Sequence, residues 1–362
     1  MTHLMKDKTD IAQNPNHTKV PFIIAGPCSA ESEEQLMATA VELAKEKRIN
    51  ALRAGIWKPR TKPGGFEGAG TKGLAWMAQA KKQTGLPIAV EVATSKHVED
   101  SLHFDVDILW VGARTTVNPF SVQQLADAVK GTDVTVLIKN PINPDVNLWA
   151  GAVERFAKAG VTKIGLIHRG FSAYGKSEFR NVPLWQIPIE LKRLFPELPM
   201  LCDPSHICGN TTLLPSTVQK SIDLDYDGLI IESHINPKEA WTDAAQQVSP
   251  SDLTDLLDSV IWKSNYADEE SFRRELDSLR EQINYFDEEL ISLINSRMLA
   301  AMKIGSLKKK NSITIFQNTR WSEILEKLTE KGKQFGFSEE FMHTYLEAIH
   351  LESIRLQNQV KE

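Results

Sequence analysis

The sequence GLIIESH at residues 228–234 is a short apolar run that ends in side chains suited to catalysis or metal binding. Seven earlier runs repeat this design, and the eight runs carry, in chain order, Cys28, Arg53, Glu91, Arg114, Lys139, Arg169, His206 and Glu232 at or near their ends. Helix-like stretches separate nearly all of them. Eight strands that alternate with helices predict a (β/α)8 barrel, whose active site lies at the C-terminal ends of the strands. The runs therefore predict both a fold and a ring of candidate site residues.

Length, composition and charge narrow the class of protein. The 362 residues suffice for one barrel and a smaller domain, and 41% hydrophobic with 25% charged residues is typical of a globular protein. A net charge of −5 argues against a nucleic-acid binder. No apolar run reaches the roughly 18 residues that a membrane span needs. Three cysteines are too few for a disulfide framework and favour a reducing, cytoplasmic setting.

Changes in polarity and in hydrophobic pattern along the sequence predict three segments. We expect a loose polar tail over residues 1–18, a barrel domain over 19–263 and a helical domain over 264–362. Two helical patterns of the last segment lie near Thr319–Lys333 and after Ser338, which is suited to cap a helix N-terminus. A longer helix precedes them, and its apolar residues recur at steps of four and three, the heptad seam of a helix packed on another helix. The seam is Phe272, Leu276, Leu279, Ile283, Phe286, Leu290 and Leu293.

Four residues near the ends of the first, seventh and eighth runs predict a metal site. They are Cys28, His206, Glu232 and Asp243. A thiolate, an imidazole and two carboxylates suit Mn, Fe, Co or Zn better than Mg or Ca. The first and last strands of a closed barrel are neighbours, so these ligands are able to converge. The competing interpretation for each residue alone is structural, because a lone cysteine is usually a small buried apolar residue.

Cationic side chains also follow the predicted strands. In an acidic protein, several cations around one barrel mouth focus a field on an anionic ligand. Arginine binds phosphate or carboxylate through paired hydrogen bonds, so this ring predicts a doubly charged substrate or two phosphorylated substrates. Each cation alone is equally compatible with a surface charge. The ring is Arg53, Lys58, Arg60, Arg114, Lys139, Arg169 and Arg180.

The helical segment contains cations on its inner faces. Arg297 takes the place where the next apolar seam residue belongs, and Lys308 lies about three turns further on nearly the same face. Ser353 and Gln357 share a face at a spacing of four. Arg280 lies on a different face of the first helix. A polar layer in a coiled coil explains this spacing as well as a ligand pocket does.

Short motifs across the barrel resemble a known family. They are GPCS at 26–29, LR at 52–53, KPRT at 58–61, GAR at 112–114, IKN at 138–140, HRG at 168–170, DPSH at 203–206, ESH at 232–234 and TDA at 242–244. Together they resemble 3-deoxy-D-arabino-heptulosonate 7-phosphate (DAHP) synthase, the entry enzyme of the shikimate pathway. The resemblance implies an aldol-like condensation of phosphoenolpyruvate with erythrose 4-phosphate to DAHP and phosphate, in aromatic amino acid biosynthesis.

The resemblance also implies residue roles. The divalent metal would be bound by Cys28, His206, Glu232 and Asp243. Phosphoenolpyruvate would be held by Arg53, Lys58, Arg114, Lys139 and Arg169. The stretch Lys58-Pro59-Arg60-Thr61 belongs to the substrate site, with Arg60 and Thr61 holding erythrose 4-phosphate. Lys58 is expected to donate a proton to the new alkoxide.

The helical segment resembles the all-helical chorismate mutases over Glu275–Gln357. LREQI at 279–283, GSLKK at 305–309 and ESIRLQ at 352–357 carry the match. The resemblance implies rearrangement of chorismate to prephenate, with Arg297 and Lys308 as the principal catalytic cations. It further implies a homodimer formed through this domain, in which Arg280 reaches the partner's site. The full pocket would be Arg280, Arg297, Lys308, Arg320, Ser353 and Gln357.

The helical segment departs from that pattern at one place. The family has an acidic pair around the fourth cation, where this chain has Gln317 and Trp321. Glutamine still forms hydrogen bonds, but tryptophan cannot accept one as a carboxylate does.

Three alternatives stay open at this point. In the first alternative, the helical domain is a non-catalytic module that dimerises and senses chorismate or prephenate, and the bound ligand inhibits the barrel reaction. A sister family makes octulosonate 8-phosphate from arabinose 5-phosphate, but its matching loop typically reads Lys-Ala-Asn-Arg-Ser, so Lys58–Thr61 favours the shorter sugar. A Schiff-base aldolase would need a lysine at a strand end, for which Lys139 is the candidate.

Overall fold

The computed structural model describes residues 21–58, 64–263 and 270–359. The chain divides into two compact units, Met1–Tyr266 and Ala267–Glu362. Each unit has its own architecture and is described by itself. Within the described residues, no helix is long and apolar enough to cross a membrane.

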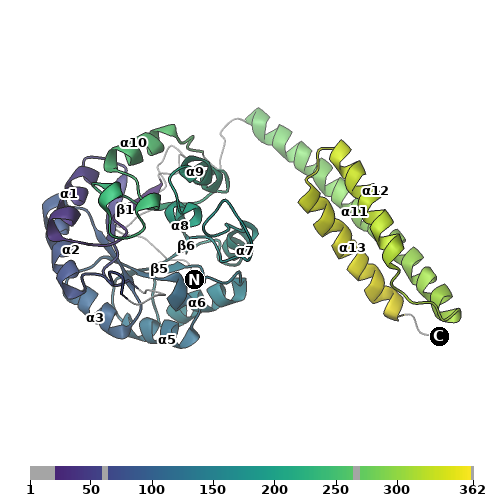
Figure 1. The fold of residues 1–362 in the computed structure, drawn as a ribbon, viewed down its shortest axis with the longest axis horizontal. Helices are drawn as coiled ribbons and strands as arrows, with labels where there is room; N and C mark the ends of the chain where they lie inside the picture. The colour runs from purple at the N-terminus through teal and green to yellow at the C-terminus, as the bar shows by residue number, and fades with distance from the viewer. Residues whose placement is uncertain (1–20, 59–63, 264–269, 360–362) are drawn as a thin grey trace. The chain divides into compact units, whose positions relative to one another are not determined.

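The first unit is a closed barrel of eight parallel strands in the order β1 to β8, which confirms the fold predicted from the sequence (Figure 1). Each strand pairs with the next, and β1 pairs with β8 to close the ring. Runs rich in Val, Ile and Leu form these strands because a parallel barrel strand is buried on both faces. The strands are Phe22–Gly26, Ile49–Ala54, Ile88–Val92, Ile108–Val111, Thr135–Lys139, Ile164–His168, Met200–Cys202 and Gly228–Glu232.

Helices surround the barrel (Figure 1). Several begin where the sequence offers a capping oxygen: Ser32, Thr94 and Asp145 each accept a hydrogen bond from a backbone N–H of the first turn. The helices are α1 Glu33–Leu43, α2 Thr71–Thr84, α3 Ser95–His103, α4 Ala113–Thr116, α5 Pro119–Ala128, α6 Val146–Lys158, α7 Gln186–Leu194, α8 Pro204–Cys208, α9 Leu214–Asp223 and α10 Pro250–Ser259.

Two buried layers hold the barrel together. The larger lies between the strands and the helices and includes Trp149 and Phe156 of α6. The smaller fills the barrel interior and includes Ile24, Trp110 and Ile230. Because one residue in two along each strand points inward, the sequence pattern of uninterrupted apolar runs supplies both layers.

The connection after β8 differs from the sequence prediction. The sequence after the eighth apolar run predicts a helix-like stretch near Pro237–Gln246, but the structure has two short 3₁₀ helices, η1 Pro237–Glu239 and η2 Ala244–Gln246. The residue before η2, Asp243, adopts a positive φ of 49°, which a continuous α-helix excludes. The segment then returns to the strand, where the backbone N–H of Val248 donates to the carbonyl of Glu232 at 3.1 Å. This return brings the Asp243 loop back over the end of β8.

The second unit consists, in its described part, of helices α11 Glu270–Lys310, α12 Asn318–Gln334 and α13 Glu339–Gln359. Helix α13 packs against both α11 and α12 (Figure 1). The predicted N-cap of the last helix is in place, because Ser338 Oγ accepts from the backbone N–H of Phe341 at 3.1 Å. Along α11, the seam residues Leu290 and Leu293 are 51% and 65% exposed in this single chain. The apolar seam therefore lacks a covering within the described part of its own unit.

Candidate active sites in the two units

The four predicted metal ligands lie at the C-terminal end of the barrel strands, where they form two pairs. Sγ of Cys28, just after β1, lies 3.3 Å from Oδ2 of Asp243. Nε2 of His206, in α8 just after β7, lies 3.8 Å from Oε1 of Glu232, the last residue of β8. The barrel thus brings ligands from three strand ends to one place, as a closed ring of strands requires.

Neighbouring groups orient two of these side chains. Nδ1 of His206 contacts Asp203, 3.0 Å from its Oδ1, so the remaining nitrogen Nε2 faces Glu232. Oε2 of Glu232 accepts a hydrogen bond of 2.6 Å from Nε2 of Gln246. Its other oxygen, Oε1, is buried and has no hydrogen-bond partner in the part of the chain that the structure describes. A carboxylate that orients a ligating imidazole is a common arrangement in metal sites.

The donor atoms of these four residues suit a divalent cation, although their side chains do not form one group of ligands. Among the described residues, no three His, Cys, Asp or Glu side chains form a group that could hold a metal ion. Nζ of Lys58 lies 2.6 Å from Sγ of Cys28, so an ammonium group adjoins the thiol. The buried Oε1 of Glu232, which accepts no hydrogen bond from the described residues, and the mixed sulfur, nitrogen and oxygen donors match a borderline divalent ion.

Burial and local charge set the protonation of this cluster. Burial and the charge of Glu232 raise the pKa of the Cys28 thiol to about 12. Burial also acts to raise the pKa of Asp243, but Arg180 and Lys58 outweigh it and lower that pKa to about 2. The thiol is thus neutral and Asp243 charged at neutral pH without a metal, and metal binding has to displace the thiol proton.

Arg53 is a buried cation with free hydrogen-bond donors beside this cluster. Its side chain is 2% exposed, and its Nη2 lies 3.2 Å from Oε1 of Glu232. Its Nε and Nη1 have no hydrogen-bond partners among the described residues. The guanidinium lies over the ring of Trp110, 5.0 Å from the centroid, and Nζ of Lys139 lies 5.7 Å from the same centroid. Two buried donors without acceptors are costly unless an anion occupies the site.

The remaining cations of the predicted ring differ in their surroundings. Nζ of Lys139 pairs with Oδ2 of Asp203 at 2.8 Å. Nη1 of Arg169 donates to Oδ1 of Asn181 at 2.7 Å, and burial lowers the pKa of Arg169 to about 10. Arg114 lies in α4, immediately after β4. Arg180 pairs with Asp243 at 3.0 Å, so the structure links it to a candidate ligand.

Part of the predicted substrate stretch cannot be described. Pro59, Arg60 and Thr61 lie outside the described residues. The glycine and proline residues of Lys58–Gly73 predict a loop over this stretch, but α2 already begins at Thr71.

Sequence reasoning did not identify Trp110, Asp203 or Gln246 as site residues. Trp110 looks like one more apolar residue of β4, and its Nε1 donates to Glu91 at 2.9 Å. Asp203 belongs to the quoted DPSH motif, three residues before His206, and this spacing on a helix start was the available signal. Nothing in the local sequence marks Gln246, because its role depends on how the loop after β8 closes.

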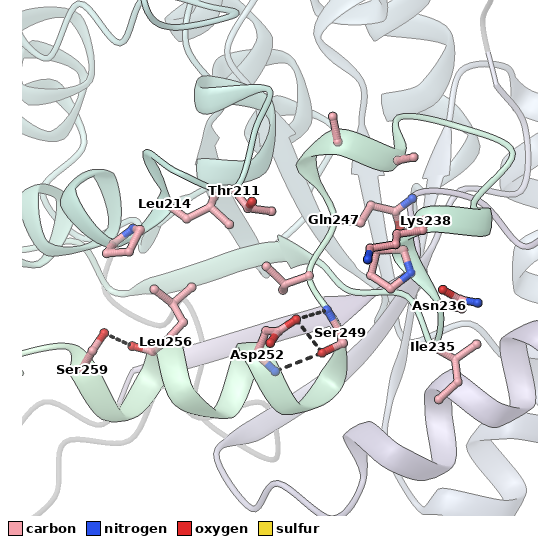
Figure 2. A pocket seen from close by; sticks show the side chains of 15 residues that line it. Thr211, Leu214, Ile235, Asn236, Lys238, Gln247, Ser249, Asp252, Leu256 and Ser259 are labelled. Carbon is pink, nitrogen blue, oxygen red and sulfur yellow. Dashed lines mark hydrogen bonds between the residues drawn. The ribbon is translucent and has the colours of Figure 1, made fainter.

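A pocket is lined in part by the loop after β8. It has a volume of about 1060 Å³ and lies among the start of α9, the loop after β8 and helix α10 (Figure 2). Leu214, Ile235 and Leu256 give it apolar walls, while Ser249 and Asp252 satisfy each other through a capping box. Of the candidate ligands, none lines it. This pocket is therefore distinct from the buried cluster at the strand ends.

In the helical unit, α11 and α13 bring two predicted pocket residues together. Nη1 of Arg297 donates to Oγ of Ser353 at 2.5 Å. Nζ of Lys308 donates to the carbonyl of Ile315 at 2.5 Å. Oε1 of Gln357 is buried and has no hydrogen-bond partner among the described residues, and its side chain lies against Gly305, one turn before Lys308. These groups line one face between the helices.

The other predicted pocket residues are more exposed. Arg320 pairs with Glu323 at 3.0 Å and Arg280 with Asp277 at 3.3 Å, each within its own helix. Trp321, at a position where the family carries an acid, stacks on His350 with ring centroids 4.1 Å apart. Within a single chain, the structure thus leaves Arg280 apart from the Arg297 and Ser353 pair.

Comparison with known proteins identifies the barrel. The family model described as DAHP synthetase I family matches residues 9–267. The chain belongs to this family. A second model, chorismate mutase type II, matches residues 279–358. The resemblances seen in the barrel motifs and in the helical segment are both confirmed, whereas the individual residue roles stay predictions.

Individual relatives agree with this family. A phospho-2-dehydro-3-deoxyheptonate aldolase of Thermotoga maritima is 32% identical over 226 residues, which is 62% of this chain and 64% of that protein. A 2-dehydro-3-deoxyphosphooctonate aldolase of Helicobacter pylori is 28% identical, covering 67% of this chain and 95% of that protein. A solved DAHP synthase from Thermotoga maritima superimposes with a TM-score of 0.58 at 29% identity, over 66% of this chain and 67% of the other.

Proposed function

We propose that the barrel condenses phosphoenolpyruvate with erythrose 4-phosphate to give DAHP and phosphate. The observation that carries this proposal is the pairing of an anion site with a cation site. Among the described residues, Nε and Nη1 of Arg53 are buried without hydrogen-bond partners, and so is Oε1 of Glu232, which lies 3.2 Å from Nη2 of Arg53. The match to the DAHP synthetase I family supports the choice of reaction.

Each residue of the cluster has a proposed task. Arg53, Lys139 and Arg169 bind the phosphate and carboxylate of phosphoenolpyruvate, with Arg114 completing the ring. Lys58, next to Cys28, donates the proton that the new hydroxyl group needs. A divalent ion held by Cys28, His206, Glu232 and Asp243 would supply Lewis acidity toward the aldehyde oxygen. Burial of Arg53 and Glu232 keeps water from screening these interactions.

The test is phosphoenolpyruvate consumption by the intact chain with and without chelation. We expect chelated protein to be inactive and Mn²⁺, Fe²⁺, Co²⁺ or Zn²⁺ to restore turnover, while Cys28→Ala stays inactive with any of them. Full turnover by Cys28→Ala would remove Cys28 from the metal role. Borohydride trapping with substrate covers the Schiff-base alternative, and a covalent adduct at Lys139 would favour it.

A second aldehyde deserves direct comparison because octulosonate-phosphate synthases are among the relatives. We expect erythrose 4-phosphate to be preferred over arabinose 5-phosphate, since the chain carries Lys58-Pro59-Arg60-Thr61 and matches the DAHP synthetase I model. Measuring kcat/KM for both aldehydes shows which one the barrel prefers. A higher kcat/KM for arabinose 5-phosphate would reassign the barrel.

We further propose that the helical unit rearranges chorismate to prephenate. Arg297 and Lys308 would bind the two carboxylates and the ether oxygen, where they stabilise a polar transition state without a covalent or acid–base step. The match to the chorismate mutase type II model and the contact between Arg297 and Ser353 support this. Chorismate consumption by the intact chain, compared with a truncation ending at Lys263, tests it. Equal turnover by both proteins would contradict it.

The exposed seam of α11 supports a homodimer formed through the helical unit. Leu279, Phe286 and Leu290 are each more than half exposed in one chain, and a second copy offers the same stripe. A dimer would also let Arg280 serve the partner's pocket.

Under the sensing alternative, prephenate bound at the helical unit inhibits the barrel reaction. Unchanged synthase kinetics at saturating prephenate would contradict that inhibition.

A further inference from the structure

The loop after β8 ends in two adjacent buried glutamines. Gln246 is 1% exposed and Gln247 is 2% exposed, although glutamine is usually a surface residue. Buried amides are retained only when their donors and acceptors are satisfied. The partners of these two amides are therefore informative.

The partners of Gln246 fix which way its amide points. Nη1 of Arg180 donates to Oε1 of Gln246 at 2.6 Å, and Nε2 of Gln246 donates to Oε2 of Glu232 at 2.6 Å. Arginine can only donate, and a charged carboxylate can only accept. The carbonyl oxygen must therefore face Arg180, and the NH₂ group must face Glu232. The flipped amide would lose both hydrogen bonds.

This arrangement occupies one oxygen of Glu232 and leaves the other. Oε2 is held by Gln246, whereas Oε1 is buried without a hydrogen-bond partner among the described residues and faces the charge of Arg53, whose Nη2 lies 3.2 Å away. The same Nη1 of Arg180 also contacts Oδ1 of Asp243 at 3.0 Å. A single chain of contacts thus runs from Glu232 through Gln246 and Arg180 to Asp243.

Gln247 secures the loop from the other side. Its Oε1 accepts from the backbone N–H of Cys28 at 2.9 Å, and its Nε2 donates to the carbonyl of Thr242 at 2.8 Å. These bonds flank Asp243, whose positive φ of 49° is a strained conformation for a residue other than glycine. Strain of this kind persists only where the surroundings hold it, so the loop is built to keep Asp243 in place.

We propose that Gln246 is a positioning residue that presents Oε1 of Glu232 to the divalent cation and, through Arg180, holds Asp243 beside it. The inference rests on the proposed metal-dependent reaction. A neutral amide suits this task because it orients the carboxylate without carrying a charge that competes with the cation. Hydrogen-bond partners of ligating carboxylates commonly alter metal affinity when removed.

The test measures metal affinity of the intact chain. Co²⁺ is titrated into metal-free protein, and binding is followed by the absorption of the cobalt–thiolate bond and by calorimetry. The variant Gln246→Met keeps the length of the side chain but removes both hydrogen bonds. Gln246→Asn is a second variant whose shorter amide cannot span from Arg180 to Glu232. We expect each to weaken Co²⁺ binding about 10- to 100-fold.

The chain supplies a matched control in Gln123. Its Oε1 accepts from Arg155 and its Nε2 donates to Asp127, both at 2.9 Å, so it repeats the contacts of Gln246 at a half-buried place away from the candidate ligands. Gln123→Met should leave Co²⁺ affinity unchanged. Thermal unfolding of the metal-free proteins separates a loss of fold from a loss of affinity. If Gln246→Met fails to fold, Gln246→Asn decides.

Two failures are distinguishable. If wild-type protein shows Co²⁺ binding that Cys28→Ala abolishes, yet both Gln246 variants bind Co²⁺ as tightly as wild type, Gln246 has no positioning role. If wild-type protein shows no Cys28-dependent binding at all, the proposed metal site itself is wrong and the inference falls with it.

Discussion

At the scale of single residues, the barrel site is marked by buried polar groups that form no hydrogen bond among the described residues. Among the described residues, two buried donors of Arg53 and one buried oxygen of Glu232 form no hydrogen bond, and the two side chains lie 3.2 Å apart as an ion pair. Leaving such groups unpaired costs about 1–3 kcal/mol each, more when they are charged. A fold retains them where a bound ligand completes the hydrogen bonds. Anion and cation sites side by side match a phosphorylated substrate that reacts next to a metal.

Replacing Arg53 by lysine tests the anion site. Lysine keeps the charge but loses the planar fork that binds phosphate or carboxylate with two parallel hydrogen bonds. We expect the KM for phosphoenolpyruvate to rise at least about tenfold, which corresponds to about 1.4 kcal/mol of binding. Steady-state kinetics at saturating aldehyde measure it. A matched variant, Arg193→Lys, changes an exposed arginine of α7 paired with Glu190 and should leave this KM unchanged. An unaltered KM in Arg53→Lys would contradict the assignment.

At the scale of elements, one arginine ties the loop between α1 and β2 to the helix α10. Arg48, between α1 and β2, forms two hydrogen bonds with Glu46, of 2.8 and 2.7 Å, and an ion pair of 2.7 Å with Asp258 of α10. The hydrogen bond from Arg48 outweighs partial burial and lowers the pKa of Glu46 from 4.5 to about 2. The Arg48–Asp258 ion pair therefore links α10 to the loop before β2, while the Glu46–Arg48 pair holds the arginine in place.

The pH dependence of stability follows from this pair. A carboxylate whose pKa is lower in the folded state stabilises the protein above its unfolded pKa, and that stabilisation is lost as pH falls through the folded pKa. We expect Glu46→Gln to lower the free energy of unfolding at pH 7 by no more than about 1 kcal/mol, because solvent screens the pair. The difference from wild type should shrink between pH 4.5 and about 2. Urea unfolding across this range measures it, and a difference independent of pH would contradict the account.

The apolar seam of α11 gives a second prediction at this scale. Leu290 lies on the seam and is 51% exposed, whereas the adjacent Ile291 lies off it and is 67% exposed. Because a buried unpaired lysine is costly, Leu290→Lys should convert the expected dimer into a monomer. Ile291→Lys, the matched control, should stay dimeric. Light scattering reports the mass. A dimer in Leu290→Lys, or a monomeric wild type, would show that the seam is not the interface.

At the scale of the whole molecule, most of the fold was predictable because its signals are local. Apolar runs bounded by charged residues, such as Thr135–Lys139, match the strands directly. The heptad seam likewise predicted α11. The helix predicted for Pro237–Gln246 was wrong. The left-handed conformation of Asp243 is dictated by the closure of the loop over β8 and not by its neighbours in sequence.

The candidate site was predictable only in part. Strand-end motifs placed Cys28, His206 and Glu232 correctly at one end of the barrel, since strand ends in a parallel barrel share an edge. The contacts of Gln246 and of Trp110 depend on side chains distant in sequence, Arg180 and Arg53. No local pattern contains that information. The helical pocket is harder to predict for another reason, because Arg280 is expected to act in the pocket of a second copy of the chain.

The proposed functions assign one active site to each unit of the chain. The most direct test measures phosphoenolpyruvate consumption with erythrose 4-phosphate, and chorismate consumption, in the same preparations of wild type, Cys28→Ala and Arg297→Ala. The account predicts that wild type performs both reactions. Cys28→Ala should lose only the first, and Arg297→Ala should lose only the second, by about 100-fold or more. A wild type that leaves chorismate unchanged, or chorismate turnover unaffected by Arg297→Ala, would contradict the claim.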